Sequence, residues 1–296
     1  RPLLVSKGLV DSESLGIVGG GLSGLSLAYR IGLERPDLPI KLIEKTGRLG
    51  GVIETWREDE WICDISVNAV RPHPSFWRLV DDLGMSDSFG PSRGIASSRW
   101  IILRGGKHRI SPATILKIGA FGFLRGAFNS RKVGSSVLDV LQNREIADAM
   151  TLGIVNDTAD QVDANFLFPS LTGFGPKAPV SRRSLQKKIS KSYPIFTPRK
   201  GSLASLEGGM EDIIRVLHDT ISKMGNVEII LENGEGGPEE LSSAYDIPIS
   251  SMIWTSSLPG RDHGETTLSV FAVGFQEEEV SGVEIGYGTL IPDPNT

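Results

Sequence analysis

The sequence predicts an α/β protein built on a doubly wound, Rossmann-like parallel sheet, and three observations support this. A short apolar strand at 15–18 runs into a glycine turn and then a helix, reading LGIVGGGLSGLSLAYRI. A second apolar strand, Ile40–Ile43, ends in Glu44. Helical and strand patterns alternate again between 206 and 231. Such alternation is typical of a parallel sheet that carries helices on its faces.

The turn contains the pattern G-x-G-x-x-G at Gly19, Gly21 and Gly24. The first glycine permits a tight turn, the second lets the backbone approach a pyrophosphate, and the third lets the helix pack closely on the strand. The N-terminus of the helix offers free N–H groups to the same pyrophosphate. The predicted pyrophosphate-binding residues are Gly19, Gly20, Gly21, Leu22, Ser23 and Gly24.

Glu44 follows Gly24 by 20 residues and stands at the end of the second predicted strand. A carboxylate at this place can accept hydrogen bonds from the diol of a ribose. Because strand, turn, helix, strand and acid occur in this order, the pattern predicts dinucleotide binding rather than a chance glycine turn.

The run after the second strand, EKTGRLGG, narrows the ligand. Its pattern E-x-x-x-R-x-G-G resembles the flavin-dependent amine oxidase superfamily, which includes protoporphyrinogen oxidases and phytoene desaturases. The resemblance implies FAD as the cofactor, with the arginine near the flavin and its phosphates and the glycine pair beside the isoalloxazine. The cofactor residues implied in this run are Lys45, Arg48, Gly50, Gly51 and Val52. The alternative is a solvated arginine in an ordinary turn.

The composition is that of a globular chain of one or two domains. Of 296 residues, 39% are hydrophobic and 23% are charged, and the net charge of −5 gives no nucleic-acid signature. The single Cys63 excludes an internal disulfide framework. Four histidines lie without ligand spacing, so we expect no metal site. Residues 1–10 are basic and apolar, which indicates either a mitochondrial presequence or a flexible tail.

Two strands are expected at 52–55 and 61–65, paired through a turn. In the stretch CDISVNAVRP the superfamily usually has an acidic residue followed by Gly-Pro beside the flavin. Asp64 fits the acidic position, whereas a serine and a valine replace the Gly-Pro. The residues implied here as cofactor contacts are Ser66, Val67, Asn68 and Ala69.

A helix at 76–83, closed by Gly84, is followed by an expected hairpin at 98–112. The hairpin resembles the protoporphyrinogen oxidase segment R-F-hydrophobic-turn-G-K-L-H-P-L-P. The resemblance implies that Arg99 faces the substrate cavity and pairs with a propionate, which suits the bidentate fork of a guanidinium. A surface arginine at a strand start is the alternative.

The segment 115–128 is apolar but too short to span a bilayer. It reads either as a core helix or as a helix in the membrane interface. One amphipathic helix is expected at 136–150, and Asn156 replaces a glycine of the family pattern. Residues 173–200 hold eight basic side chains and no acid, as in a solvated loop or a lipid-headgroup contact.

The nucleotide-binding domain is expected to resume at 201. A helix after 210 places Ile213, Ile214, Leu217 and Ile221 on one face, and a strand follows at 227–231. In the resembling family, a Pro-Val pair just after this strand lays backbone against the adenine, and the resemblance implies Gly236 as the corresponding contact here. Further strands are expected at 249–254, 268–275 and 286–291.

The expected organisation is an FAD-binding domain in two segments with an inserted substrate domain and a helical, membrane-associated part. The expected segments are an N-terminal tail (1–14), a first FAD-binding segment (15–75), a substrate and helical region (76–200), a second FAD-binding segment (201–258) and the start of a truncated substrate domain (259–296). The family continues beyond the last residue, so we expect a fragment.

The resemblance implies FAD-dependent oxidation of protoporphyrinogen to protoporphyrin in heme biosynthesis, with oxygen as acceptor. It implies a tetrapyrrole substrate, a membrane surface as partner, and a peripheral place at the mitochondrial inner membrane. A homodimer remains open, and no acid–base catalytic residue is singled out. The alternatives are another flavin oxidase or desaturase acting on amines or carotenoids, and a degenerate homologue without catalysis.

Overall fold

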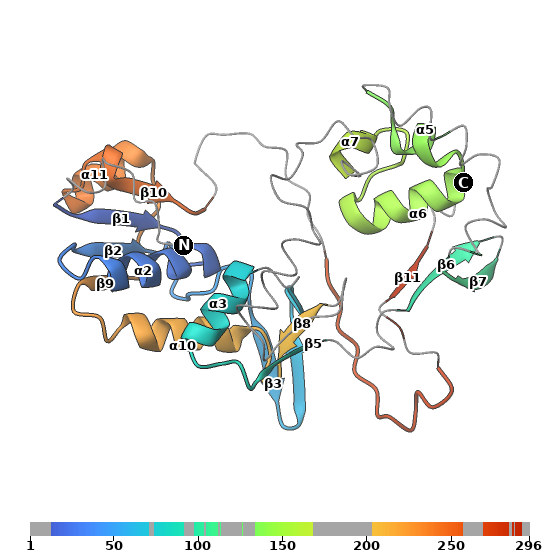
Figure 1. Ribbon diagram of the computed structural model, residues 1–296, viewed down its shortest axis with the longest axis horizontal. Helices are drawn as coiled ribbons and strands as arrows, with labels where there is room; N and C mark the ends of the chain where they lie inside the picture. The colour runs from blue at the N-terminus through green and yellow to red at the C-terminus, as the bar shows by residue number, and fades with distance from the viewer. Residues whose placement is uncertain are drawn as a thin grey trace. The chain divides into compact units, whose positions relative to one another are not determined.

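The structure is a computed structural model, and it describes residues 13–70, 74–91, 98–103, 105–111, 113, 126, 134–167, 203–256, 269–283, 286 and 288–291. The chain divides into two compact units, whose elements are labelled in Figure 1. Unit 1 comprises Arg1–Pro91 and Lys200–Gly274, and unit 2 comprises Ser92–Arg199 and Phe275–Thr296.

A four-stranded parallel sheet forms the centre of unit 1. Its strands are β1 (Leu15–Val18), β2 (Ile40–Ile43), β9 (Val227–Ile230) and β10 (Met252–Trp254). They are arranged in the order β10-β1-β2-β9, and each neighbouring pair is parallel. This is the order that begins a Rossmann sheet, with the first strand in the middle. The predicted doubly wound α/β domain is therefore confirmed.

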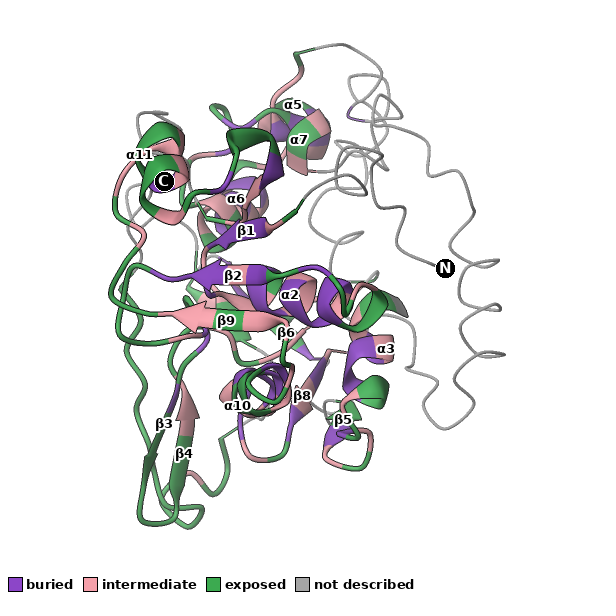
Figure 2. Ribbon diagram, turned by 90° about the vertical axis from the view of Figure 1, so that its left-hand side faces the viewer, coloured by how far each residue is buried: buried purple, intermediate pink, exposed green. Residues whose placement is uncertain are grey.

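Helix α2 (Leu22–Glu34) follows β1 and packs on β1, β2 and α10 (Glu211–Ile221). The two central strands and α2 are largely buried, as their colour in Figure 2 shows. All four residues of β1 are buried, as expected for a strand covered on both faces. The apolar face predicted for α10 is also correct, because its four predicted residues are its buried ones.

Helix α11 (Pro238–Tyr245) connects β9 to β10 and was missed by sequence reasoning, which expected only a glycine loop before the next strand. The helix is short, polar and has a single buried residue, Leu241, so its apolar periodicity is weak. Its start did carry a signal, because proline occupies the first turn and Glu239 and Glu240 follow it. The predicted strand at 249–254 begins only at Met252, after a 3-10 turn, η2 (Ile249–Ser251).

A hairpin of β3 (Thr55–Glu58) and β4 (Trp61–Asp64) is attached to the start of α10. The Thr55 hydroxyl donates to Asp64 over 2.6 Å and accepts the N–H of Glu211 over 3.0 Å. Asp64 also accepts the N–H of Met210 over 2.8 Å. The side chains of the hairpin therefore bind N–H groups at the beginning of α10, which the helix itself leaves unpaired.

The strand expected at 52–55 is wrong in its bounds. Ile53 donates its N–H to the carbonyl of Gly50 over 3.0 Å, so this stretch closes a turn and β3 starts only at Thr55. Elsewhere in unit 1, α3 (Pro74–Asp82) is followed by Gly84 at φ +70°, as expected of a glycine C-cap. A small antiparallel pair joins β5 (Phe89–Pro91) to β8 (Ala204–Leu206).

Unit 2 contains the predicted hairpin, formed by β6 (Arg99–Leu103) and β7 (Gly106–Arg109). Strand β11 (Gly288–Leu290) pairs in parallel with β6, which confirms part of the strand expected at 286–291. The strand expected at 268–275 is wrong for its described residues, 269–275, which have no strand assignment. Its apolar alternation resembles a strand, but a strand also needs a hydrogen-bonded neighbour.

The single helix expected at 136–150 is wrong, because the chain forms α5 (Val137–Leu141) and α6 (Arg144–Val155). Gln142 adopts the left-handed conformation at φ 56°, and the Asn143 side chain then accepts the N–H of Ile146 to cap α6. A helical pattern of apolar residues does not reveal such a break.

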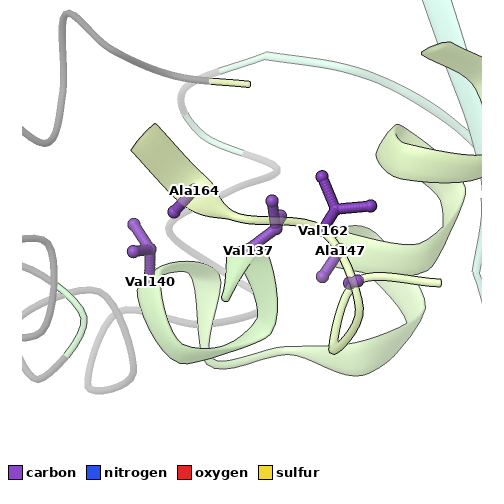
Figure 3. Close-up of a cluster of buried hydrophobic side chains, with 6 residues drawn as sticks. Val137, Val140, Ala147, Val162 and Ala164 are labelled. Atoms are coloured by element: carbon purple, nitrogen blue, oxygen red, sulfur yellow. The ribbon is translucent and has the colours of Figure 1, made fainter. Parts of the chain in front are cut away.

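A cluster of small buried side chains holds α5, α6 and α7 (Ala164–Leu167) together (Figure 3). Its buried members are Val137, Val140, Ala147, Ala159, Val162 and Ala164. Asn156 ends α6 at φ 55°, a conformation that asparagine tolerates better than most residues and that suits the glycine of the family pattern. The apolar segment 115–128, apart from Gly126, and the basic block 173–200 lie outside the described residues.

Gly209→Ala should destabilise unit 1. Gly209 has φ +95°, and a Cβ there would collide with Thr55 Cγ2 where the hairpin meets α10. We expect a loss of about 1–3 kcal/mol in the free energy of unfolding, measured by urea denaturation. Gly225→Ala is the matched control, since nothing lies within 4 Å of the added Cβ among the described residues. Equal losses in the two variants would contradict this account of the hairpin.

Candidate functional site

The candidate site lies at the carboxyl end of β1, where the order of the sheet reverses. The chain leaves β1 toward β2 on one side, while β10 pairs with β1 on the other. Crevices at such switch points are where open α/β sheets bind their ligands. The turn at this switch point runs from Gly19 to Gly21 and enters α2 directly.

Each of the three motif positions has a different structural relation to glycine. Gly19 has φ +110°, which only glycine adopts easily. A Cβ on Gly24 would collide with the carbonyl oxygen of Gly19, so this glycine allows the close approach of helix and turn. Gly21 is different: it has φ −71°, and an added Cβ would lie 4.0 Å from Gly51 Cα, its only neighbour within that distance in the described chain.

Glu44 connects the glycine turn to the end of β2. Its Oε2 accepts the N–H of Gly20 over 2.7 Å, and the residue as a whole is 7% exposed. Its Oε1 accepts the N–H of Thr46 over 2.9 Å and the Thr46 hydroxyl over 2.8 Å. The carboxylate therefore holds the turn in place and keeps further acceptor capacity for a ribose diol.

The pKa of Glu44 lies below its usual value. Burial of the carboxyl raises the pKa, but the hydrogen bonds from Gly20 and Thr46 and the charge of Lys45 together lower it by more. Glu44 is therefore a carboxylate at neutral pH, as the acceptor of a ribose diol must be.

The run after Glu44 returns to the glycine turn. Gly50 donates its N–H to the carbonyl of Gly20 over 2.9 Å, and Gly51 lies against Gly21. The Arg48 guanidinium donates to the carbonyls of Gly51, Ile53 and Leu49 over 2.6, 3.0 and 3.2 Å. The sequence resemblance placed Gly50 and Gly51 beside the isoalloxazine, and it foresaw neither their contact with the glycine turn nor the structural use of Arg48.

The structure brings most of the predicted cofactor residues to one place. Leu22 and Ser23 form the first turn of α2, and no side chain of the described residues caps this helix. Lys45 and Val52 flank the returning run, and both are exposed. This group comprises Gly19, Gly20, Gly21, Leu22, Ser23, Gly24, Glu44, Lys45, Arg48, Gly50, Gly51 and Val52.

Other predicted residues lie elsewhere in the fold. Ser66, Val67, Asn68 and Ala69 follow β4, and their neighbour Val70 pairs with Ala204. Gly236, at φ +118°, precedes α11. The same loop begins close to the site, because Asn233 donates its N–H to the carbonyl of Glu44 over 3.1 Å. Arg99 belongs to unit 2.

Sequence reasoning missed Thr255, which follows β10. Its N–H donates to the carbonyl of Val18 over 2.9 Å, and its hydroxyl lies 3.0 Å from the carbonyl oxygens of Val18 and Gly19. A threonine just after the fourth strand of an expected Rossmann sheet was the available signal, because that position adjoins the switch point.

In the described ranges, no group of three or more His, Cys, Asp and Glu side chains is arranged to hold a metal ion. None of the helices in those ranges has both the length and the apolar character needed to cross a bilayer.

The sheet order, the glycine turn and the acid at the end of β2 define a dinucleotide-binding protein of the Rossmann-like class. Residues 17–83 match the family model of the NAD(P)-binding Rossmann-like domain. A solved structure provisionally named protoporphyrinogen oxidase, from Exiguobacterium sp. 255-15, matches 75% of this chain and 53% of its own with a TM-score of 0.53 at 22% identity. That likeness concerns the fold.

Two curated relatives extend over most of the chain. Coproporphyrinogen III oxidase of Staphylococcus aureus is 20% identical over 95% of this chain and 71% of its own length. Protoporphyrinogen oxidase 2 of Arabidopsis thaliana, named chloroplastic/mitochondrial, is 25% identical over 87% of this chain and 55% of its own length. The chain is thus similar, over most of its length, to proteins named protoporphyrinogen and coproporphyrinogen oxidase, which confirms the resemblance inferred from its motifs. These relatives imply FAD as the cofactor.

Glu44→Gln should make unit 1 less sensitive to acid. A carboxyl whose pKa is lowered by folding stabilises the fold above its unfolded pKa of about 4.3, and this stabilisation is lost as the pH falls through the folded value. We expect the wild-type protein to lose about 1 kcal/mol more than the variant over that fall. Urea denaturation at pH 7 and at decreasing pH measures the difference. Glu228→Gln, at an exposed position on β9, is the control and should keep the wild-type profile.

Proposed function

We propose that the turn after β1 binds FAD and that the whole protein is a flavin-dependent porphyrinogen oxidase. The observation that carries the proposal is the open side of Gly21. The fold requires glycine at Gly19 and Gly24, whereas at Gly21 the backbone and the surrounding space accept a side chain. A glycine that the fold does not require fits close approach by a ligand.

The residues present fit the adenosine and pyrophosphate parts of FAD. Gly21 and the first turn of α2 would hold the pyrophosphate, with the backbone N–H groups of Leu22 and Ser23 directed along the helix axis. Glu44 would accept the ribose hydroxyls. Gly51 would lie beside the pyrophosphate, because its backbone is in contact with Gly21.

When bound, FAD would supply the capacity to accept the hydride removed from the substrate. This chain's residues would bind and orient the cofactor rather than exchange protons with the substrate. Arg48 would act through the loop that it holds, since its guanidinium already donates to three backbone carbonyls.

The proposed substrate is a porphyrinogen, and the proposed reaction is the oxidation of protoporphyrinogen IX to protoporphyrin IX in heme biosynthesis, with oxygen as the electron acceptor. The names of the relatives support this substrate class, and coproporphyrinogen III belongs to the same class. Attachment at the mitochondrial inner membrane belongs to the same proposal.

Gly21→Val tests the cofactor site. The branched side chain would occupy the space that the pyrophosphate needs, so the dissociation constant for FAD should rise at least about tenfold. The unfolding midpoint should stay near the wild-type value, because φ −71° and ψ 178° suit valine.

Gly225→Val is the control for this change. Gly225 precedes β9 at the opposite, amino end of the sheet, and an added Cβ there meets no described atom within 4 Å. Wild-type FAD affinity in Gly21→Val, measured by titration calorimetry, would contradict the assignment of this turn.

The geometry of Arg99 suits a substrate contact. Side chains alternate along a strand, so Arg99 shares a face of β6 with Ile101 and Leu103. Those two side chains are buried and form a cluster with Ala149 of α6. Arg99 is exposed at the beginning of the strand. We propose that its guanidinium binds a propionate of the tetrapyrrole.

Arg99→Ala should weaken binding of protoporphyrin IX about fivefold, because a charge-assisted hydrogen bond to a carboxylate is lost at an exposed position. Arg99→Lys should recover part of the affinity, since lysine has the charge but not the fork. Arg109→Ala removes an exposed arginine from the other face of the same hairpin and should leave affinity unchanged. Porphyrin fluorescence titration gives these constants. Equal affinities for the wild type and Arg99→Ala would remove Arg99 from the substrate site.

A further inference from the structure

One peptide group of the glycine turn is held at both ends by side chains from other strands. The peptide between Gly19 and Gly20 presents its carbonyl oxygen to Thr255, whose hydroxyl lies 3.0 Å away. It presents its N–H to Glu44, whose Oε2 lies 2.7 Å away. In a planar trans peptide the two groups point in opposite directions, so the two contacts together fix the plane of the group.

The position of this peptide determines the shape of the turn. The Gly19 carbonyl oxygen is the atom that a Cβ on Gly24 would strike, so it lies at the closest approach of α2 to the turn. The Thr255 hydroxyl would lie 2.8 and 2.9 Å from a Cβ on Gly19 and Gly24. Thr255 therefore fills the space that both glycines leave, between the turn and the end of β10.

We propose that Thr255 is a positioning residue for the dinucleotide. Its hydroxyl and the Glu44 carboxylate hold the peptide between Gly19 and Gly20, and this orientation directs the following backbone of Gly21 and α2 toward the pyrophosphate. Thr255 acts through the turn and not by touching the ligand, because its hydroxyl faces the carbonyls of Val18 and Gly19. The inference rests on the proposed FAD site.

The proposal predicts a specific loss in Thr255→Val, which keeps the shape of the side chain and removes the hydroxyl. We expect its dissociation constant for FAD to rise about fivefold to tenfold, as for the loss of one hydrogen bond. Thr255→Ser restores the hydroxyl and should return the constant to within about twofold of wild type.

Thr220→Val is the matched control. The Thr220 hydroxyl also donates to a backbone carbonyl, that of Val216 over 2.6 Å, but it does so within α10. A hydroxyl with a purely structural role would lower the unfolding temperature and leave FAD affinity, measured well below that temperature, unchanged. We expect this behaviour of Thr220→Val and not of Thr255→Val.

A double-mutant cycle with Glu44→Ala, which removes the acceptor of the Gly20 N–H, makes the test sharper. If both side chains hold one peptide group, the second substitution should weaken FAD binding by a smaller factor when the first is already present. The dissociation constant of the double variant should then be lower than the product of the two single fold-changes predicts. Calorimetric titration of FAD into the wild type, the two single variants and the double variant provides the four constants.

The outcomes are distinct. A wild-type chain that binds no FAD would overturn the proposed function and the inference with it. Wild-type binding together with an unchanged constant in Thr255→Val would overturn the inference alone. Independent, multiplicative effects of Thr255→Val and Glu44→Ala would also overturn it, because two separate supports would then act on different groups.

Discussion

The hydrogen bond from the Gly20 N–H to the buried Glu44 carboxylate is the interaction on which the candidate site depends. It joins the turn after β1 to the end of β2 over 2.7 Å. The other oxygen of the same carboxylate binds Thr46, where the chain begins its return toward the turn. That return ends when Gly50 donates to the carbonyl of Gly20. One carboxylate thus connects the two glycine pairs of the candidate site.

The site separates the needs of the fold from those of the ligand. A left-handed backbone requires Gly19, and close helix packing requires Gly24. Neither reason applies to Gly21, so the absence of a side chain there is better explained by the close approach of a ligand. For a similar reason, we no longer expect Arg48 to contact the cofactor directly. Its guanidinium binds carbonyls of the loop that contains Gly50 and Gly51, so the role that we propose for it is to hold the shape of that loop.

The sequence predicted the structure correctly where a short-range pattern of residues determines it. The strands at 15–18 and 40–43, the apolar face of α10 and the glycine cap of α3 all follow from local periodicity or from a glycine conformation. Sequence reasoning failed where a long-range or capping contact decides. Asn143 divides one expected helix into two, and a segment with strand-like alternation at 269–275 lacks strand structure.

Thr255 shows the same limit within the site. Its hydroxyl meets the Gly19 carbonyl across 236 residues of sequence, and only the sheet order brings them together. The glycines of the motif could be predicted because they lie close together in sequence, within one strand–turn–helix unit. The supporting contact from Thr255 could not be predicted, because Thr255 follows a strand whose place in the sheet the local sequence does not determine.

The measurement that tests the account most directly is a competition between dinucleotides for the purified chain. FAD and NADP⁺ are titrated separately and then together, with binding followed by calorimetry and by the flavin absorbance spectrum. The account predicts one FAD bound per chain, a perturbed flavin spectrum and no displacement by NADP⁺ at comparable concentration, because the Glu44 carboxylate would repel a ribose phosphate. Binding of NADP⁺ in preference to FAD, or of neither, would contradict it.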